Sequence, residues 1–347
     1  MDRKVYLLDA KNKIEFLLET HMRKPGALIV SLDFELNWGV HDVFSLDQYG
    51  PQLHGARQAI PRMLDLFKQY EIHATWGVVG LLFFETKEEL LINLPNIKPS
   101  YNHANFSPYR KLDMVGENEK MDPIHFGFSL ISQISKAPHQ EIGTHTFSHY
   151  YCLEEGQSSE EFEADLITAK LVFQQRGFNM QSFIFPRNQI ENSYLQICEK
   201  HGVTSYRGNE TSWVYEASNF SQQQLVKRAV RLFDHYVNLT GHHTYKLETV
   251  EKEPIINLSS SRFLRPYCKK LKMLEPFRLR RIKNSLTYAA EKGEVYHLWW
   301  HPHNFGKNID ENIQFLRDIL EHVELLKNRY SFRSLNMKEA TETLMAT

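Results

Sequence analysis

The sequence predicts an α/β fold built on a parallel sheet or barrel. Short continuous apolar runs, typical of strands buried on both faces, alternate along the chain with longer segments of helical apolar spacing. A polar cluster follows several of these apolar runs. In repeated strand–helix units the chemistry lies at the carboxyl ends of the strands, so these clusters are the candidate functional residues.

The elements follow in order. The apolar runs predict strands, and helical spacing, with a glycine just past the end in two cases, predicts helices. Strands are expected at residues 27–32, 74–79, 141–143, 182–185, 203–206 and 295–300. Helices are expected at residues 59–67, 126–134, 160–175, 193–201 and 312–328. The polar segment 85–122 is too long for an ordinary connection, so we predict an insertion over the functional site.

Composition restricts the class of protein. The 347 residues carry a formal net charge of -1, which argues against nucleic acid as a partner. The three cysteines are widely spaced, so neither a disulfide framework nor a thiolate zinc site is expected. No apolar run reaches the roughly 20 residues of a transmembrane helix. The charged N-terminus does not resemble a secretory signal, so we predict a cytoplasmic location.

Two carboxylates follow the first predicted strand. Asp33 and Glu35 are one residue apart, and on an extended backbone both side chains can point to the same side. Either could bind a metal ion or accept a proton. The alternative is an ordinary pair of loop carboxylates that cap a helix.

Two histidines follow a later strand. His145 and His149 are four residues apart, which would place both imidazoles on one face of a helical turn, able to bind one ion. With 17 histidines in the chain such a pair can also arise by chance. Together with the distant Asp-x-Glu pair, the spacing predicts a metal site of two histidines and one carboxylate.

Five segments in order resemble the NodB-type polysaccharide deacetylase family, carbohydrate esterase family 4. They are Ser31-Leu32-Asp33-Phe34-Glu35, His73-Ala74-Thr75-Trp76-Gly77-Val78-Val79-Gly80, Glu141-Ile142-Gly143-Thr144-His145-Thr146-Phe147-Ser148-His149, Phe185-Pro186-Arg187-Asn188 and Leu298-Trp299-Trp300-His301-Pro302-His303. The resemblance implies a distorted (β/α)7-type barrel, the NodB homology or glycoside hydrolase-deacetylase fold. The expected division is an N-terminal extension at 1–25, a catalytic domain at 26–306 and a C-terminal helical segment at 307–347 that packs on the barrel.

The resemblance also implies how the metal is held. A divalent ion, most commonly zinc in this family, would bind Glu35, His145 and His149. Asp33 would be the general base. Because Asp33-Phe34-Glu35 replaces the adjacent aspartates of the typical motif, the roles of Asp33 and Glu35 could be reversed.

The remaining roles follow by the same resemblance. Arg187 would hold the base, although here Pro186 precedes the arginine instead of following it. His301 would protonate the departing amine, with His303 as its competitor. The family's tuning aspartate for this histidine has no clear match near residues 206–210.

Four residues are predicted to contact the substrate. The backbone N–H of Tyr150 would stabilise the oxyanion. Trp38, in the loop after Glu35, could stack on a sugar ring. Asn188 and Arg207 follow the fourth and fifth predicted strands and complete the set.

The expected function is removal of an N-acetyl or other N-acyl group from an amino sugar. The sugar would be nucleotide-linked, lipid-linked or an oligosaccharide in surface polysaccharide biosynthesis. Alternatives are a related hydrolase of formamido sugars or small non-sugar amides, and a catalytically silent sugar-binding relative. The basic run at 262–283 predicts either a solvated helical face or a patch for phosphates, whether the diphosphate of a carrier-linked sugar or an anionic membrane surface.

Overall fold

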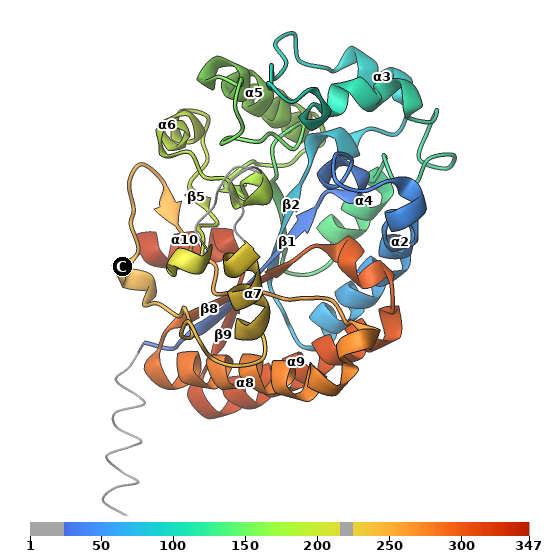
Figure 1. Ribbon diagram of the computed structural model, residues 1–347. Helices are drawn as coiled ribbons and strands as arrows, with labels where there is room; N and C mark the ends of the chain where they lie inside the picture. Colours follow the sequence, from blue (N-terminus) through green and yellow to red (C-terminus); the bar gives the residue numbers. More distant parts are fainter. Residues whose placement is uncertain (1–23, 216–224, 347) are drawn as a thin grey trace, which may run out of the picture.

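The computed structural model describes residues 24–215 and 225–346, and its centre is one sheet of parallel strands (Figure 1). The strands are β1 (Ala27–Phe34), β2 (Ala74–Val78), β3 (Gln140–Thr144), β4 (Ser182–Phe183), β5 (Ser205–Tyr206), β6 (Ile256–Asn257), β7 (Arg262–Phe263), β8 (Val295–Trp300) and β9 (Arg333–Leu335). All eight residues of β1 are buried, as its continuous apolar run predicts for a strand covered on both faces.

The order of the strands shows how the sheet curls into a barrel. Eight of them follow the order β6-β5-β4-β3-β2-β1-β8-β7, while β9 pairs with the first three residues of β1. The segment between β6 and β7 connects the two edges of the sheet, because it bonds to strands near both ends of the strand order. The Leu258 N–H donates to Tyr206 O in β5, and the Ser261 N–H donates to His297 O in β8. The predicted distorted (β/α) barrel is therefore confirmed.

Helices cover the outside of the barrel (Figure 1). They are α2 (Leu46–Gln69), α3 (Lys87–Ile92), α4 (Phe128–Lys136), α5 (Ser159–Gln175), α6 (Asn192–Lys200), α7 (Leu225–Asp234), α8 (Glu275–Lys292), α9 (Ile309–Tyr330) and α10 (Met337–Met345). Local signals set several boundaries. A capping box of Ser158 and Glu161 begins α5, and Gly177, at φ 78°, follows its end in the left-handed region that favours glycine.

Two regions contain more structure than the sequence suggests. The insertion at 85–122 contains α3 and two short 3-10 helices, η3 (Ala104–Phe106) and η4 (Pro108–Met114). The C-terminal segment contributes strand β9 to the sheet as well as helices. The predicted N-terminal extension lies almost wholly outside the described residues, so it stays a prediction.

Candidate active site

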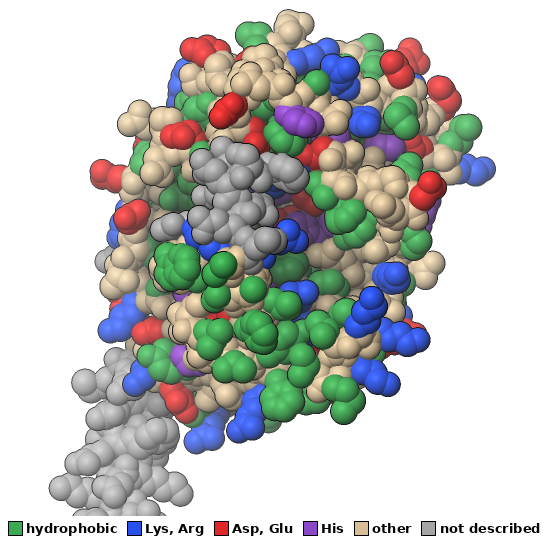
Figure 2. Space-filling view, in the orientation of Figure 1, with side chains coloured by type: hydrophobic (Ala, Val, Ile, Leu, Met, Phe, Trp, Pro, Cys, Tyr) green, Lys and Arg blue, Asp and Glu red, His purple; other side chains and the backbone are tan. Residues whose placement is uncertain are grey.

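The site residues come from the carboxyl ends of three strands. Asp33 lies in β1 and Glu35 directly follows it, His145 and His149 follow β3, and His301 follows β8. Because these strands are parallel, their carboxyl ends meet at one end of the barrel. In Figure 2, histidine and acidic side chains are visible in a recess on the face shown.

Three buried side chains converge in a way that fits a divalent metal ion. Glu35 Oε2 is 3.2 Å from His145 Nε2 and 3.0 Å from His149 Nε2. His145 Nδ1 lies 2.8 Å from the carbonyl oxygen of Ile184, to which it must donate, so His145 Nε2 carries a lone pair when the ring is neutral. A lone pair facing a carboxylate is unfavourable unless a cation or proton lies between them. The structure thus brings the three predicted ligands together, and their chemistry suits zinc.

Electrostatics keep this cluster in the form that binds a metal. Burial raises the pKa of Glu35, but His301, His149 and His145 together hold it well below its usual range. Burial lowers the pKa of His149 to about 4, against the attraction of Glu35. Near neutral pH the carboxylate is therefore ionised and the His149 imidazole is neutral, as metal ligands must be.

The segment that carries the two histidines is a loop, so the predicted helical turn is wrong. Thr146 and His149 have φ values of 63° and 59°, which helices exclude. The loop is anchored by Asp165 of α5, which accepts the Phe147 N–H at 2.7 Å, the Ser148 N–H at 3.1 Å and the Ser148 hydroxyl. Asp165 is not among the site residues that the sequence predicts. The sequence could have indicated this residue, because Asp165 is an acidic side chain among the apolar positions that form the buried stripe of the helix.

Asp33 is held by an arginine, but the residue is Arg207 and not Arg187. Arg207 Nη1 donates to Asp33 Oδ1 at 2.6 Å and Nη2 donates to Oδ2 at 2.8 Å. Nη2 also donates to Asn188 Oδ1 at 2.8 Å, so Asn188 orients the arginine. Burial raises the pKa of Asp33, but the charge and hydrogen bonds of Arg207 outweigh it and the pKa is lowered. Asp33 is ionised at neutral pH.

Arg187 lies elsewhere, so its predicted contact with Asp33 is wrong. It donates to Asp42 at 2.5 Å, and its guanidinium lies 4.0 Å from the centre of the Tyr151 ring. The physical reason is the turn at Pro186–Asn188, where Arg187 adopts a φ of 55°. The sequence shows only that an arginine follows β4, whereas the turn decides where it points.

His301 and His303 differ in exposure. The side chain of His301 is 23% exposed, and its Nε2 is 3.8 Å from Asp33 Oδ2 and 3.6 Å from Glu35 Oε1. The His303 side chain is 3% exposed, and burial lowers its pKa to about 3, so it is neutral at neutral pH. A group that protonates a departing amine must reach the substrate and carry a proton. The geometry favours His301 for that role.

Comparison with known proteins identifies the family. Residues 48–206, which include both motif histidines, match the family model described as polysaccharide deacetylase. This segment, somewhat less than half of the chain, belongs to the polysaccharide deacetylase family. Members are hydrolases of carbon–nitrogen bonds other than peptide bonds. No curated protein matches the sequence significantly.

Solved structures show the same fold at low sequence identity. A protein from Mycobacterium smegmatis assigned as a polysaccharide deacetylase has a TM-score of 0.58 at 12% identity, covering 93% of this chain and 91% of its own. Puue allantoinase has a TM-score of 0.54 at 10% identity, and the match covers 92% of this chain and 90% of the allantoinase. A Pseudomonas aeruginosa PAO1 protein assigned to the polysaccharide deacetylases has a TM-score of 0.54 at 9% identity. The match covers 91% of this chain and 89% of that protein. These likenesses concern the fold alone.

Two of the predicted substrate contacts are wrong. Trp38 is fully buried in the core, and its Nε1–H donates to the carbonyl oxygen of His125 at 2.9 Å, so no sugar can stack on it. The Tyr150 N–H already donates to Thr146 Oγ1 at 2.7 Å and is not free for an oxyanion. Arg207, also predicted to bind substrate, is buried against Asp33 and serves to position it.

A chain of hydrogen-bonded polar side chains continues from Arg207 inside the barrel. Arg207 Nη1 donates to Ser31 Oγ at 3.2 Å, and Ser31 Oγ is 2.8 Å from His297 Nε2. His297 Nδ1 lies 3.0 Å from the carbonyl oxygen of Leu258, to which it must donate. Burial lowers the pKa of His297 to about 3, so the ring is neutral and Nε2 can accept from Ser31. The sequence could have indicated this chain, because Ser31 and His297 are polar residues within the apolar runs of β1 and β8.

The basic run at 262–283 divides into two kinds of residue. Arg262, Arg278 and Arg281 are buried. Arg262 pairs with Asp234 at 2.9 Å, and Arg278 pairs with Glu275. The remaining lysines and Arg280 are exposed or half-buried. The run is thus neither a uniform solvated face nor a uniform patch for phosphates.

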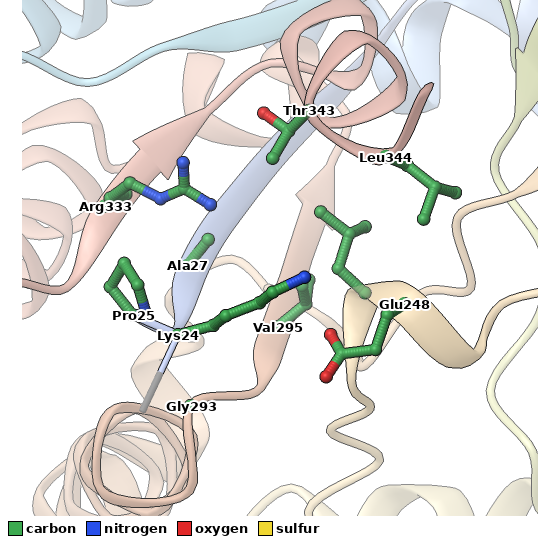
Figure 3. A pocket seen from close by; sticks show the side chains of 10 residues that line it. Lys24, Pro25, Ala27, Glu248, Gly293, Val295, Arg333, Thr343 and Leu344 are labelled. Atoms are coloured by element: carbon green, nitrogen blue, oxygen red, sulfur yellow. The ribbon is translucent and has the colours of Figure 1, made fainter. Parts of the chain in front are cut away.

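Other features of the molecule lie away from the site. At the opposite end of the barrel a pocket opens beside the first residues of β1 and β8, between Lys24, Glu248 and Arg333 (Figure 3). His73, His139 and Glu339 also lie close together at that end, with the two imidazoles stacked face to face at 3.9 Å. No helix in 24–215 or 225–346 is long and apolar enough to cross a membrane.

We expect a double-mutant cycle to distinguish the two arginines. The pair Asp33→Asn and Arg207→Met should show a coupling free energy of about 1 to 3 kcal/mol, because the side chains are in contact, whereas Asp33→Asn with Arg187→Met should show less than about 0.5 kcal/mol. Urea unfolding of the single and double variants measures both values. A larger coupling through Arg187 would contradict the assignment.

Loss of the Asp165 anchor should weaken the metal site. In Asp165→Ala the loop loses three hydrogen bonds, so we expect the affinity for zinc to fall by about tenfold or more, as when outer-shell partners of metal ligands are removed. Competition with a chromogenic chelator measures this. The matched control is Glu163→Ala on the same helix, whose side chain pairs with Lys200 and His201. Equal affinities in the two variants would show that the anchor does not act on the site.

Proposed function

We propose that this polysaccharide deacetylase hydrolyses the N-acetyl group of an amino sugar with the help of one divalent ion. The observation that carries the proposal is the approach of Glu35, His145 and His149 to within bonding reach of one cation, with Asp33 and His301 directly beside them. Amide hydrolysis needs an activated water, a base and an acid, and each has a candidate group at this end of the barrel.

The ion that we propose is zinc, held by Glu35 Oε2 and by Nε2 of His145 and His149. Three protein ligands leave an open position, which is typical of catalytic zinc sites. When bound, zinc polarises a carbonyl group and lowers the pKa of water to roughly 7, so that amide hydrolysis becomes possible near neutral pH.

The protein's own residues then divide the proton transfers. We assign the general base to Asp33 because it is ionised and lies outside the three-ligand cluster, with both carboxylate oxygens oriented by Arg207. We assign the general acid to His301, since an amine leaves poorly unless its nitrogen gains a proton. The alternative, in which Glu35 is the base and Asp33 a ligand, is less well supported, because Glu35 lies between the two imidazoles.

For the substrate we propose an amino sugar carried on a nucleotide or lipid diphosphate during surface polysaccharide biosynthesis. Support comes from the exposed part of the basic run, Lys269, Lys270, Lys272 and Arg280, which could meet phosphate oxygens. The cytoplasmic location that would give access to such precursors stays a prediction, because residues 1–23 lie outside the described part of the chain.

Acetate release from a panel of substrates tests the proposal. The zinc-loaded protein is incubated with nucleotide-linked, lipid-linked and polymeric N-acetyl amino sugars and with their N-formyl counterparts. We expect acetate from a carrier-linked sugar and none from the Asp33→Asn variant. Formate release alone would point to a formamido sugar, and no release from any substrate by folded, metal-loaded protein would overturn the proposed activity.

A further inference from the structure

Two neighbouring elements expose a group of large apolar side chains. They are α7, with the turn that follows it, and the start of α8, with the preceding 3-10 helix η9 (Lys269–Leu274). Isolated exposed apolar residues are ordinary, but a contiguous group on a soluble chain indicates a binding surface. We call this group the apolar face: Val226, Phe233, Val237, Leu239, Met273 and Phe277, each more than half exposed.

Buried contacts hold the two parts of the apolar face together. Arg262 pairs with Asp234 at the end of α7, and Arg281 of α8 donates to the carbonyl oxygen of Gly241 at 2.5 Å. The rings of His242 and Tyr288 stack at 4.6 Å. In Figure 2, hydrophobic side chains gather over α7 and below it, with Lys and Arg side chains around them. The buried arginines of the basic run thus fix the segment after α7 onto α8.

The charge around the apolar face is strongly positive. Exposed cations accompany it on the same elements: Arg228, Lys269, Lys270, Lys272 and Arg280. In residues 225–240 and 262–283 the only acids are Asp234 and Glu275, and both pair with buried arginines. The chain as a whole has a formal charge of -1, so this positive charge is local.

We propose that the apolar face binds the surface of a membrane that contains anionic phospholipids. Apolar side chains entering the boundary between headgroups and acyl chains, with cations meeting lipid phosphates, is the combination by which surface elements bind such membranes. A second copy of the chain fits less well, because an isologous contact would bring the cations of both copies together. Nucleic acid would leave the apolar side chains without a partner.

A chain of aromatic rings connects the candidate active site with the segment that carries part of the apolar face. The rings of His301 and Phe263 are 5.7 Å apart, and those of Phe263 and His235 are 6.4 Å apart, which leads directly to the residues after α7. Membrane binding goes beyond the proposed function and does not depend on it. If the proposed deacetylation is correct, the same contact would favour lipid-linked sugars over soluble ones.

Flotation with lipid vesicles tests the proposal. The full-length protein is mixed with vesicles of phosphatidylcholine alone or of phosphatidylcholine and phosphatidylglycerol. We expect binding to the anionic vesicles that weakens with salt, and at least about a tenfold loss of binding for Phe233→Ser/Phe277→Ser, because two large apolar side chains no longer enter the interface. Lys269→Gln/Lys270→Gln/Lys272→Gln should weaken binding to the anionic vesicles and leave binding to vesicles of phosphatidylcholine alone unchanged.

Two controls keep the result specific. Ile92→Ser/Met121→Ser replaces two exposed apolar side chains of the insertion and should bind vesicles like the wild type. Deacetylation of a water-soluble substrate should be unchanged in the apolar-face variant, which separates failure of this proposal from failure of the proposed activity. Absence of wild-type binding to anionic vesicles, or equal binding by the apolar-face variant, would overturn the proposal. The proposal would also be overturned if the wild type formed a dimer in the absence of lipid and the apolar-face variant were a monomer.

Discussion

Asp33→Asn should fold, bind zinc and lose deacetylation by at least about a hundredfold, the usual contribution of a positioned general base. Asparagine has nearly the shape of aspartate but cannot accept the proton of the attacking water. The zinc ligands proposed here, Glu35, His145 and His149, are untouched by the change. Initial rates of acetate release, with the metal content of the same preparation, measure the effect.

A matched control for this variant is available in the same structure. Asp234 is also a buried carboxylate paired with an arginine, Arg262, and its other partners are the Tyr215 hydroxyl and the backbone amides after α7 rather than residues of the group around Glu35. Asp234→Asn should therefore cost stability and leave most of the activity. Normal turnover in Asp33→Asn would refute its role as base, and an equal loss in both variants would show that the effect comes from a disturbed fold.

His145→Ala should abolish both metal binding and activity. Wild-type protein is expected to contain one divalent ion per chain, and removal of one of three ligands leaves too few to hold it. Elemental analysis after dialysis gives the ratio of metal to protein. Chelation of the wild type should likewise abolish acetate release, and added zinc should restore it.

The second histidine cluster supplies the control for this experiment. His73 also lies beside a histidine and a glutamate, but at the opposite end of the barrel. His73→Ala should keep one ion per chain and full activity. A metal-free preparation with full activity would refute the metal scheme, whereas a second ion lost in His73→Ala would show that the other cluster also binds metal.

The sequence predicts the long strands and the convergence of Glu35, His145 and His149 because both depend on local patterns, whereas the short strands β6, β7 and β9 were missed. The apolar run at 27–32 fixes β1, and the carboxyl ends of parallel strands bring Glu35 and the two histidines together whatever the intervening loops do. The exposure of Trp38 could not be predicted in this way. Its burial depends on the carbonyl oxygen of His125, far away in the sequence.

The arginine partner of Asp33 shows the same limit. Arg187 and Arg207 both follow short strands, and a resemblance to a motif selects the first. The left-handed backbone at Arg187 and the neighbouring Asp42 carry that side chain elsewhere, and Arg207 occupies the space in the barrel instead. Turn geometry and competition between side chains are properties of the folded chain, so only coordinates could decide between the two.

The barrel has a long-stranded half and a short-stranded half. Strands β1, β2, β3 and β8 have five to eight residues, whereas β4, β5, β6 and β7 have two each. Glu35 and the histidines follow long strands, but Arg207 follows short β5. Fewer ladder hydrogen bonds resist local opening there, so backbone amides of the short half should exchange with deuterium first. Transient opening of that half would release Asp33 from Arg207 and His145 from the carbonyl oxygen of Ile184, so the proposed base and one proposed metal ligand would lose their orientation together.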